Sequence, residues 1–349
     1  MSPLGAASLL ALATASGGPT APPFAYQLRP FDPASDQPHL EEICKNVYGG
    51  TDYLPSVASS LASDPLSTFV VLATNDSDDD DNRPFAAVAN LRRFLPGKAW
   101  LEAVRTCETR RNRGLARELT QELIQKARDV GDEVMTCTVD SNIAMRKVLE
   151  GAGMRYAQRI NQCSFEKMKE LPGWGAGDER EALPLLQALE AEGLIKEESR
   201  KLEWELVESR ADLDKALERI RARGGFGYLP GLWELLGDEV INASLRSGLI
   251  LKLRGGEEEA VLTLFQDDKI QSLRSKWVCS VTTCSLVGLE AALWHACSIE
   301  VRDALGGEGA FIPAFDGSVP IDIHGSICKV LPLVENRCMV YSTEAKELI

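Results

Sequence analysis

Several classes of protein are excluded by what this sequence of 349 residues lacks. It has only three histidines, His39, His295 and His324, and its nine cysteines form no C-x-x-C pair, so it offers neither a zinc framework nor an obvious disulfide framework. We expect reduced, mostly buried thiols, a cytoplasmic location and no metal. No run approaches the roughly 20 apolar residues of a membrane span.

Basic residues are outnumbered by acidic residues, 38 to 52, which gives a net charge of -14. Binding to nucleic acids or anionic membranes needs a basic face, so we expect neither as a partner.

A hydrophobic content of 44% indicates a globular chain with room for two domains. Residues 1–23 are apolar, then small and Pro-rich, with no Lys or Arg before Arg29, so they read as a disordered tail or as a cleaved targeting segment. A first domain is expected over residues 24–170, a charged helical connector over 171–224, and a second α/β domain over 225–349. Leu202, Leu206, Leu213, Leu217 and Ile220 keep helical spacing in the connector.

Hydrophobic periodicity in the first domain predicts the order β, α, α, β, β, β, α, β, α, β, an α/β (α+β) fold with a mixed sheet. Its most regular helix follows Arg113, where Leu115, Leu119, Leu123 and Ala127 form one apolar stripe. The expected strand over residues 99–107 leads directly into this helix.

Five arginines lie between Arg105 and Arg117 in this otherwise acidic chain, with Glu108 as the only acidic residue among them. They surround the turn between the strand and the helix. A helix N-terminus presents unpaired backbone N–H groups and partial positive charge, Gly114 allows close approach to the backbone, and guanidinium groups pair with phosphate. The pattern therefore predicts a pyrophosphate site, although spacing alone also fits a surface arginine cluster.

The strand LEAVRTC, the R-x-x-G-x-A turn, the amphipathic helix, the next strand and an Asn-initiated helix ending in GAGM together resemble the Gcn5-related N-acetyltransferase (GNAT) superfamily. The segments VYGGTDYLP and LEAVRTCETRRNRGLA are similar to those of the histidine N-acetyltransferase group within it. The resemblance implies acetyl-CoA as cosubstrate. It places the pyrophosphate on the turn and the pantetheine arm along the strand and the next helix, which gives these cofactor-binding residues: Val104, Thr106, Arg111, Asn112, Arg113, Gly114, Leu115, Ala116 and Asn142.

The resemblance also assigns Glu102 as general base for direct acetyl transfer. Alternation along the strand puts Glu102 on one face with Val104 and Thr106, and Arg105 on the other face. The tyrosine that protonates the leaving thiolate in many family members is replaced by Leu149. Either the thiolate leaves unaided, or Tyr156 or Tyr341 substitutes.

Acceptor recognition is expected from the loop over residues 48–55, where Tyr48, Asp52 and Tyr53 offer polar groups, together with Tyr341 of the second domain. The second domain lacks an R-x-x-G-x-G/A turn, so we expect a degenerate GNAT-like fold that binds no CoA.

The function expected from the sequence is N-acetylation of a small free amino acid, histidine first, with Arg92, Arg93 or Lys98 as candidates to meet its carboxylate. Peptide or polyamine acetylation remains an alternative, as does a non-catalytic acyl-CoA sensor. The sequence does not indicate an oligomeric state.

Overall fold

The computed structural model describes most of the chain between residues 26 and 344. The described residues are 26–74, 84–162, 191, 193, 195–231, 234–254, 258–266, 277–296, 310–316 (backbone only) and 338–344. The expected N-terminal segment, residues 1–23, lies outside them. Among the described residues, none of the helices has the length and apolar character that crossing a bilayer requires.

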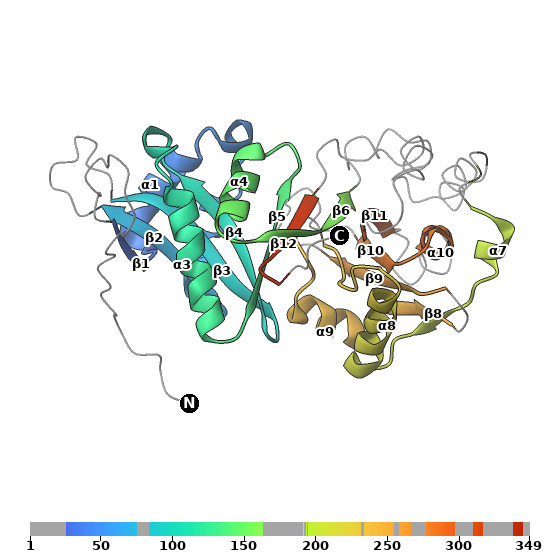
Figure 1. Cartoon of the computed structure of the whole chain (residues 1–349). Coiled ribbons are helices and arrows are strands. Elements are labelled where there is room, and N and C mark those ends of the chain that lie inside the picture. The colour runs from blue at the N-terminus through green and yellow to red at the C-terminus, as the bar shows by residue number, and fades with distance from the viewer. Residues whose placement is uncertain are drawn as a thin grey trace, which may run out of the picture.

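One mixed sheet of twelve strands runs through the molecule in the order β1-β2-β3-β4-β5-β12-β6-β11-β10-β9-β8-β7 (Figure 1). The strands nearest the site are β1 (Tyr26–Pro30), β2 (Ser67–Thr74), β3 (Phe85–Leu95), β4 (Lys98–Thr106), β5 (Glu133–Val139), β6 (Arg155–Gln162) and β12 (Cys338–Ser342). The first four are antiparallel neighbours, whereas β4 and β5 are parallel. This confirms the mixed sheet expected from the sequence.

Two pairs of helices cover the two faces of this first half of the sheet. Helices α1 (Pro33–Cys44) and α2 (Leu54–Ser63) pack on one face, which we call the α1 face. Helices α3 (Leu115–Asp129) and α4 (Ile143–Gly151) pack on the other, the α3 face. Helix α1 begins at Pro33, because the Asp32 side chain caps it and a proline is well tolerated in the first turn.

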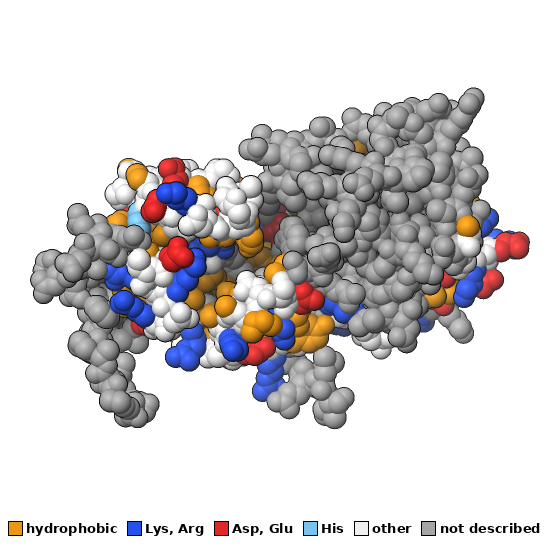
Figure 2. Space-filling view, turned by 90° about the horizontal axis from the view of Figure 1, so that it is seen from above, with side chains coloured by type: hydrophobic (Ala, Val, Ile, Leu, Met, Phe, Trp, Pro, Cys, Tyr) orange, Lys and Arg blue, Asp and Glu red, His pale blue; other side chains and the backbone are white. Residues whose placement is uncertain are grey.

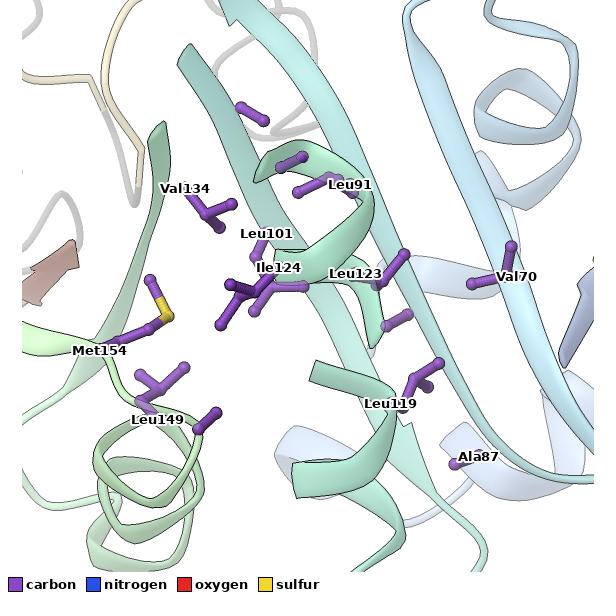
Figure 3. Close-up of a cluster of buried hydrophobic side chains, with 14 of the residues drawn as sticks. Val70, Ala87, Leu91, Leu101, Leu119, Leu123, Ile124, Val134, Leu149 and Met154 are labelled. Atoms are coloured by element: carbon purple, nitrogen blue, oxygen red, sulfur yellow. The ribbon is translucent and has the colours of Figure 1, made fainter. Parts of the chain in front are cut away.

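The predicted stripe of α3 is buried against the α3 face of the sheet, as expected (Figure 3). Leu119 and Leu123 have no exposed surface. Burying such a side chain contributes about 1.5–3 kcal/mol, which fixes the helix on β3, β4 and β5. The N-terminus of α3 is thereby held at the end of β4.

The last described strand, β12, lies between β5 and β6 and is antiparallel to both, as the red strand in the centre of Figure 1 shows. Cys338 to Ser342 pair with Val139 to Met135 of β5. The C-terminal residues thus complete the sheet of the first half.

The second half repeats the order and pairing of the first. Its elements are β7 (Trp204–Leu206), α8 (Arg210–Ala222), α9 (Asp238–Arg246), β8 (Ile250–Leu253), β9 (Ala260–Gln266), β10 (Trp277–Thr283), α10 (Leu286–Ala296) and β11 (Ala310–Asp316), preceded by a short helix, α7 (Glu197–Arg200). As in β1 to β5, four antiparallel strands are followed by a helix and a parallel strand. This confirms the GNAT-like second fold.

The reading of one continuous helical stripe from Leu202 to Ile220 was wrong. Leu206 belongs to β7, and α8 begins only at Arg210. The Ser209 hydroxyl accepts the Asp212 N–H and starts the helix there, while Trp204 to Leu206 pair with β8.

Candidate functional site

Strand β4 carries a bulge at the centre of the candidate site. Asn90 of β3 pairs with Glu102 and Val88 pairs with Arg105, so two residues of β4, Ala103 and Val104, stand opposite one residue of β3. Ala103 has a φ of 60°, which is uncommon for a residue other than glycine. A bulge leaves the ladder locally disrupted, so it frees backbone N–H groups of β4 for a ligand.

The bulge also changes the faces to which the β4 side chains point. Ala103 packs with Cys107 in the core under α1 and α2, whereas Val104 packs in the core under α3. Arg105 reaches Asp52, next to α2. Alternation had placed Glu102 on one face with Val104 and Thr106, and Arg105 on the other face, and this was wrong, because the extra residue inverts the alternation beyond Glu102. Glu102 and Arg105 share the α1 face.

Strands β4 and β5 pair over only three residues of each, Lys98 to Trp100 with Glu133 to Met135. Beyond Trp100 the two strands continue without pairing to each other, and β5 pairs with β12 on its other side. The Thr136 hydroxyl donates to the Leu101 carbonyl at 2.6 Å, at the point where pairing stops. The β4 backbone between Glu102 and Thr106 therefore lacks a β5 partner and can hydrogen-bond an extended ligand chain.

The turn before α3 has the geometry of an anion site. Asn112 and Gly114 have φ values of 64° and 83°, and no side chain caps the first turn of α3. The N–H groups that begin a 15-residue helix are therefore available, and the exposed side chains of Arg111 and Arg113 lie beside them. A Cβ at Gly114 would meet only a side-chain atom of Arg117, at 3.8 Å. These residues fit a pyrophosphate, with Leu115 and Ala116 supplying the next backbone amides.

Glu102 lies within a small polar network on the α1 face. Its Oε1 accepts a hydrogen bond from Asn90 Nδ2 at 2.9 Å and lies 3.4 Å from Arg92 Nε. Arg92 Nη2 also donates to Glu234 Oε2 of the second half, at 2.9 Å. The Glu102 side chain is 16% exposed, so it is half-buried and still within reach of a small ligand.

The residues expected in the acceptor loop have different roles. Asp52 directs both carboxylate oxygens at Arg105 and is almost fully buried. Tyr48, with a φ of 50°, is 66% exposed and places its ring over the Arg105 guanidinium. Tyr53 is 43% exposed, and burial of its hydroxyl followed by the nearby Glu102 carboxylate raises its pKa. The Glu102 carboxylate therefore acts on the Tyr53 hydroxyl.

Tyr341 and Asn142 lie on the side of α4. Tyr341 is 1% exposed, accepts a hydrogen bond from Arg146 Nε and donates one to Glu150 Oε1, both at 3.3 Å. It packs in the same core as Leu149, edge-on to Tyr156. Asn142 caps α4 by accepting the Met145 N–H at 3.1 Å. The sheet separates the Tyr341 ring from Glu102.

The basic residues considered for a substrate carboxylate are each already paired with an acid. Arg92 pairs with Glu102 and Glu234, Arg93 with Asp132, and Lys98 with Glu133. Sequence reasoning missed the contact with Glu234, since 142 residues separate it from Arg92 and no local pattern marks it. The described residues contain no group of three or more His, Cys, Asp or Glu side chains placed to hold a metal ion.

Comparisons with known proteins match part of the chain to a family. Residues 36–154, about a third of the chain, match the family model described as Acetyltransferase (GNAT) family. Among solved structures, a GCN5-related N-acetyltransferase from Sphaerobacter thermophilus is 15% identical with a TM-score of 0.49, covering 95% of this chain and 98% of that one. A putative acetyltransferase from Pyrococcus horikoshii is 12% identical with a TM-score of 0.45, covering 94% and 92%. A Bacillus subtilis acetyltransferase in complex with CoA is 16% identical with a TM-score of 0.32, covering 41% and 84%. No curated protein matches the chain.

The chain therefore contains an acetyltransferase domain of the GNAT family over residues 36–154. The description of that family gives acetyl transfer as the class of activity of this domain.

Proposed function

We propose that this protein transfers the acetyl group of acetyl-CoA to the amino group of a small amine, with Glu102 as general base. The observation that carries the proposal is the position of Glu102 directly before the β4 bulge. There a half-buried carboxylate and a disrupted backbone ladder lie side by side on one strand.

Acetyl-CoA supplies the thioester. The turn from Arg111 to Ala116 would hold its pyrophosphate, and Asn142 would contact its pantetheine arm from the start of α4. The β4 backbone around Val104 and Thr106, which has no β5 partner, would hydrogen-bond the same arm. A backbone N–H freed by the bulge near Val104 would donate to the carbonyl oxygen as negative charge develops on it.

Glu102 would accept the proton that the amine loses as the C–N bond forms, directly or through one water. The C–S bond then breaks, and the thiolate recovers a proton. Tyr341 is an unsuitable donor for that step, because its hydroxyl is buried and already hydrogen-bonded to Arg146 and Glu150.

Charge around Glu102 bears on the choice of acceptor. Two carboxylates, Glu102 and Glu234, contact the same cation, Arg92. Such a group attracts an ammonium and repels a carboxylate. We therefore place a small cationic amine, such as a polyamine, ahead of a free amino acid. Among free amino acids, histidine remains the first to test, because two segments of the sequence resemble those of the histidine N-acetyltransferase group.

One experiment tests the proposal and its rivals together. Purified protein is incubated with acetyl-CoA and a panel of polyamines, free amino acids, amino acid amides and short peptides, and CoA thiol release is followed. Acetylation of a small amine supports the proposal. Turnover with peptides alone would replace it by peptide acetylation, and CoA binding without any turnover would replace it by an acyl-CoA sensor.

A further inference from the structure

We infer that Glu234, which belongs to the second half of the chain, is a positioning residue that sets the basicity of Glu102 through Arg92. The inference rests on the proposed role of Glu102. It gives the second half a part in the reaction even if that half binds no CoA.

The contact is direct on both sides of Arg92. The guanidinium lies 3.4 Å from Glu102 Oε1 through Nε, and it donates to Glu234 Oε2 through Nη2 at 2.9 Å. All three side chains are about one-fifth exposed or less. Water therefore screens the interaction only in part, and the two carboxylates compete for one cation.

Glu234 is held in place by the backbone around it. The Gly231 N–H donates to the Glu234 carbonyl at 2.7 Å, and Pro230 and Leu235 form an isolated bridge. Leu235 is 1% exposed and packs with Phe94 and Trp100 of β3 and β4.

Gly237 fixes the other end of this segment against β3. A Cβ at this position would lie 3.1 Å from the Phe94 carbonyl oxygen, two residues along β3 from Arg92. The carboxylate is thus presented to Arg92 by a segment packed tightly on the same strand.

The same two carboxylates also affect the pKa values of other titratable groups. The hydrogen bond to Cys338 and burial raise the pKa of the Cys137 thiol, and Glu234 and Glu102 raise it further. Glu102 also acts on Tyr53. Asp64 acts on Arg92 more weakly than Glu234 and Glu102 do. Glu102 and Glu234 therefore belong to one electrostatic group, and Arg92 contacts both of them.

The sign of the effect follows from the charges. Glu234 competes with Glu102 for Arg92 and adds a negative charge nearby, so it opposes the effect of Arg92 on the Glu102 carboxylate. Loss of the Glu234 charge and loss of the Arg92 charge should therefore move the acid limb of the pH profile in opposite directions. A purely structural role for either residue would not produce shifts in opposite directions.

The test is the pH profile of kcat/KM in the full-length protein, measured with the best small amine from the panel. Glu234→Gln should move the acid limb to lower pH by about half a unit or more, and Arg92→Gln should move it to higher pH. The double variant should return close to the wild-type limb, and Arg92→Lys should stay close to it. Glu259→Gln breaks the ion pair with Arg219 elsewhere in the second half and should leave the limb unchanged.

The inference is overturned if the acid limbs of the kcat/KM profiles of the wild-type protein and Glu234→Gln coincide. It is also overturned if Glu234→Gln and Arg92→Gln shift this limb in the same direction. Thermal unfolding of each variant checks that it is folded, and Glu234→Asp serves as a second variant should Glu234→Gln be unstable. If Glu102→Gln retains full turnover, the proposed base fails and the inference falls with it. If Glu102→Gln is inactive while Glu234→Gln has the wild-type limb, only the inference fails.

Discussion

Arg105 of β4 and Asp52 of the loop before α2 are joined by two hydrogen bonds, from Nε to Oδ2 at 2.7 Å and from Nη2 to Oδ1 at 2.9 Å. The Asp52 side chain is 1% exposed and the Arg105 side chain 13%. This pair fixes the acceptor loop to the strand that carries Glu102. It is also why Asp52 is poorly placed to bind an acceptor itself.

Breaking this pair should destabilise the fold. Asp52→Asn leaves Arg105 as a half-buried charge without its carboxylate, and we expect a loss of about 3 kcal/mol in the free energy of unfolding, measured with urea. Glu197→Gln, which removes the exposed pair with Lys201, should change it by less than about 0.5 kcal/mol. Equal effects of the two variants would contradict the structural role given to Asp52.

The same pair predicts a pH dependence of stability. Burial opposes ionisation of Asp52, but the hydrogen bonds and charge of Arg105 outweigh it, and the pKa of the carboxyl lies below its usual value. A lowered pKa in the folded state gives stability that is present above the unfolded pKa and is lost as the pH falls through the folded pKa. The wild-type protein should therefore lose more stability than Asp52→Asn below about pH 4. The check is acid unfolding of both proteins, followed by circular dichroism. If the wild-type protein and Asp52→Asn lose stability in parallel as the pH falls, this prediction is wrong.

Binding of acetyl-CoA should depend on Gly114. Glutamate there would be strained at a φ of 83° and would place a negative charge at the N-terminus of α3, so calorimetric CoA binding should fall by at least about 100-fold. Gly131, at the other end of α3, has a φ of 80° and nothing within 4 Å of an added Cβ. Gly131→Glu should be similarly strained yet keep its affinity for CoA. If Gly114→Glu binds CoA with wild-type affinity, the turn before α3 does not bind the pyrophosphate.

The second half should bind no CoA, so calorimetry should give one CoA per chain. The start of α10 is already occupied, because the Ser285 hydroxyl accepts the Gly288 N–H at 3.0 Å. Strands β10 and β11 stay paired from Trp277 to Val281, with one register shift. At β10, α10 and β11, the described residues therefore offer neither an open helix N-terminus nor a separated strand pair. A stoichiometry of two would show this prediction to be wrong.

Local patterns predicted the elements that local chemistry determines. The stripe of α3 and the turn at Gly114 follow from side-chain periodicity and from a glycine that tolerates positive φ. The bulge could not be predicted in this way, because Ala103 carries no signal for a φ of 60°. The strand alternation drawn across it therefore misplaced Arg105.

Local sequence patterns did not predict the long-range contacts either. The place of β12 between β5 and β6, and the reach of Glu234 to Arg92, join residues far apart in the chain. Both depend on how the two halves pack. The expected carboxylate-binding role of Arg92, Arg93 and Lys98 did not take into account the acidic partners that this packing supplies.

The most direct test of the central claim is the turnover number of Glu102→Gln with saturating acetyl-CoA and the best small amine. The account predicts a fall in kcat of about 100-fold or more, the usual size of a general-base contribution, with the Kd for acetyl-CoA changed by less than about twofold. A kcat equal to that of the wild-type protein would contradict it.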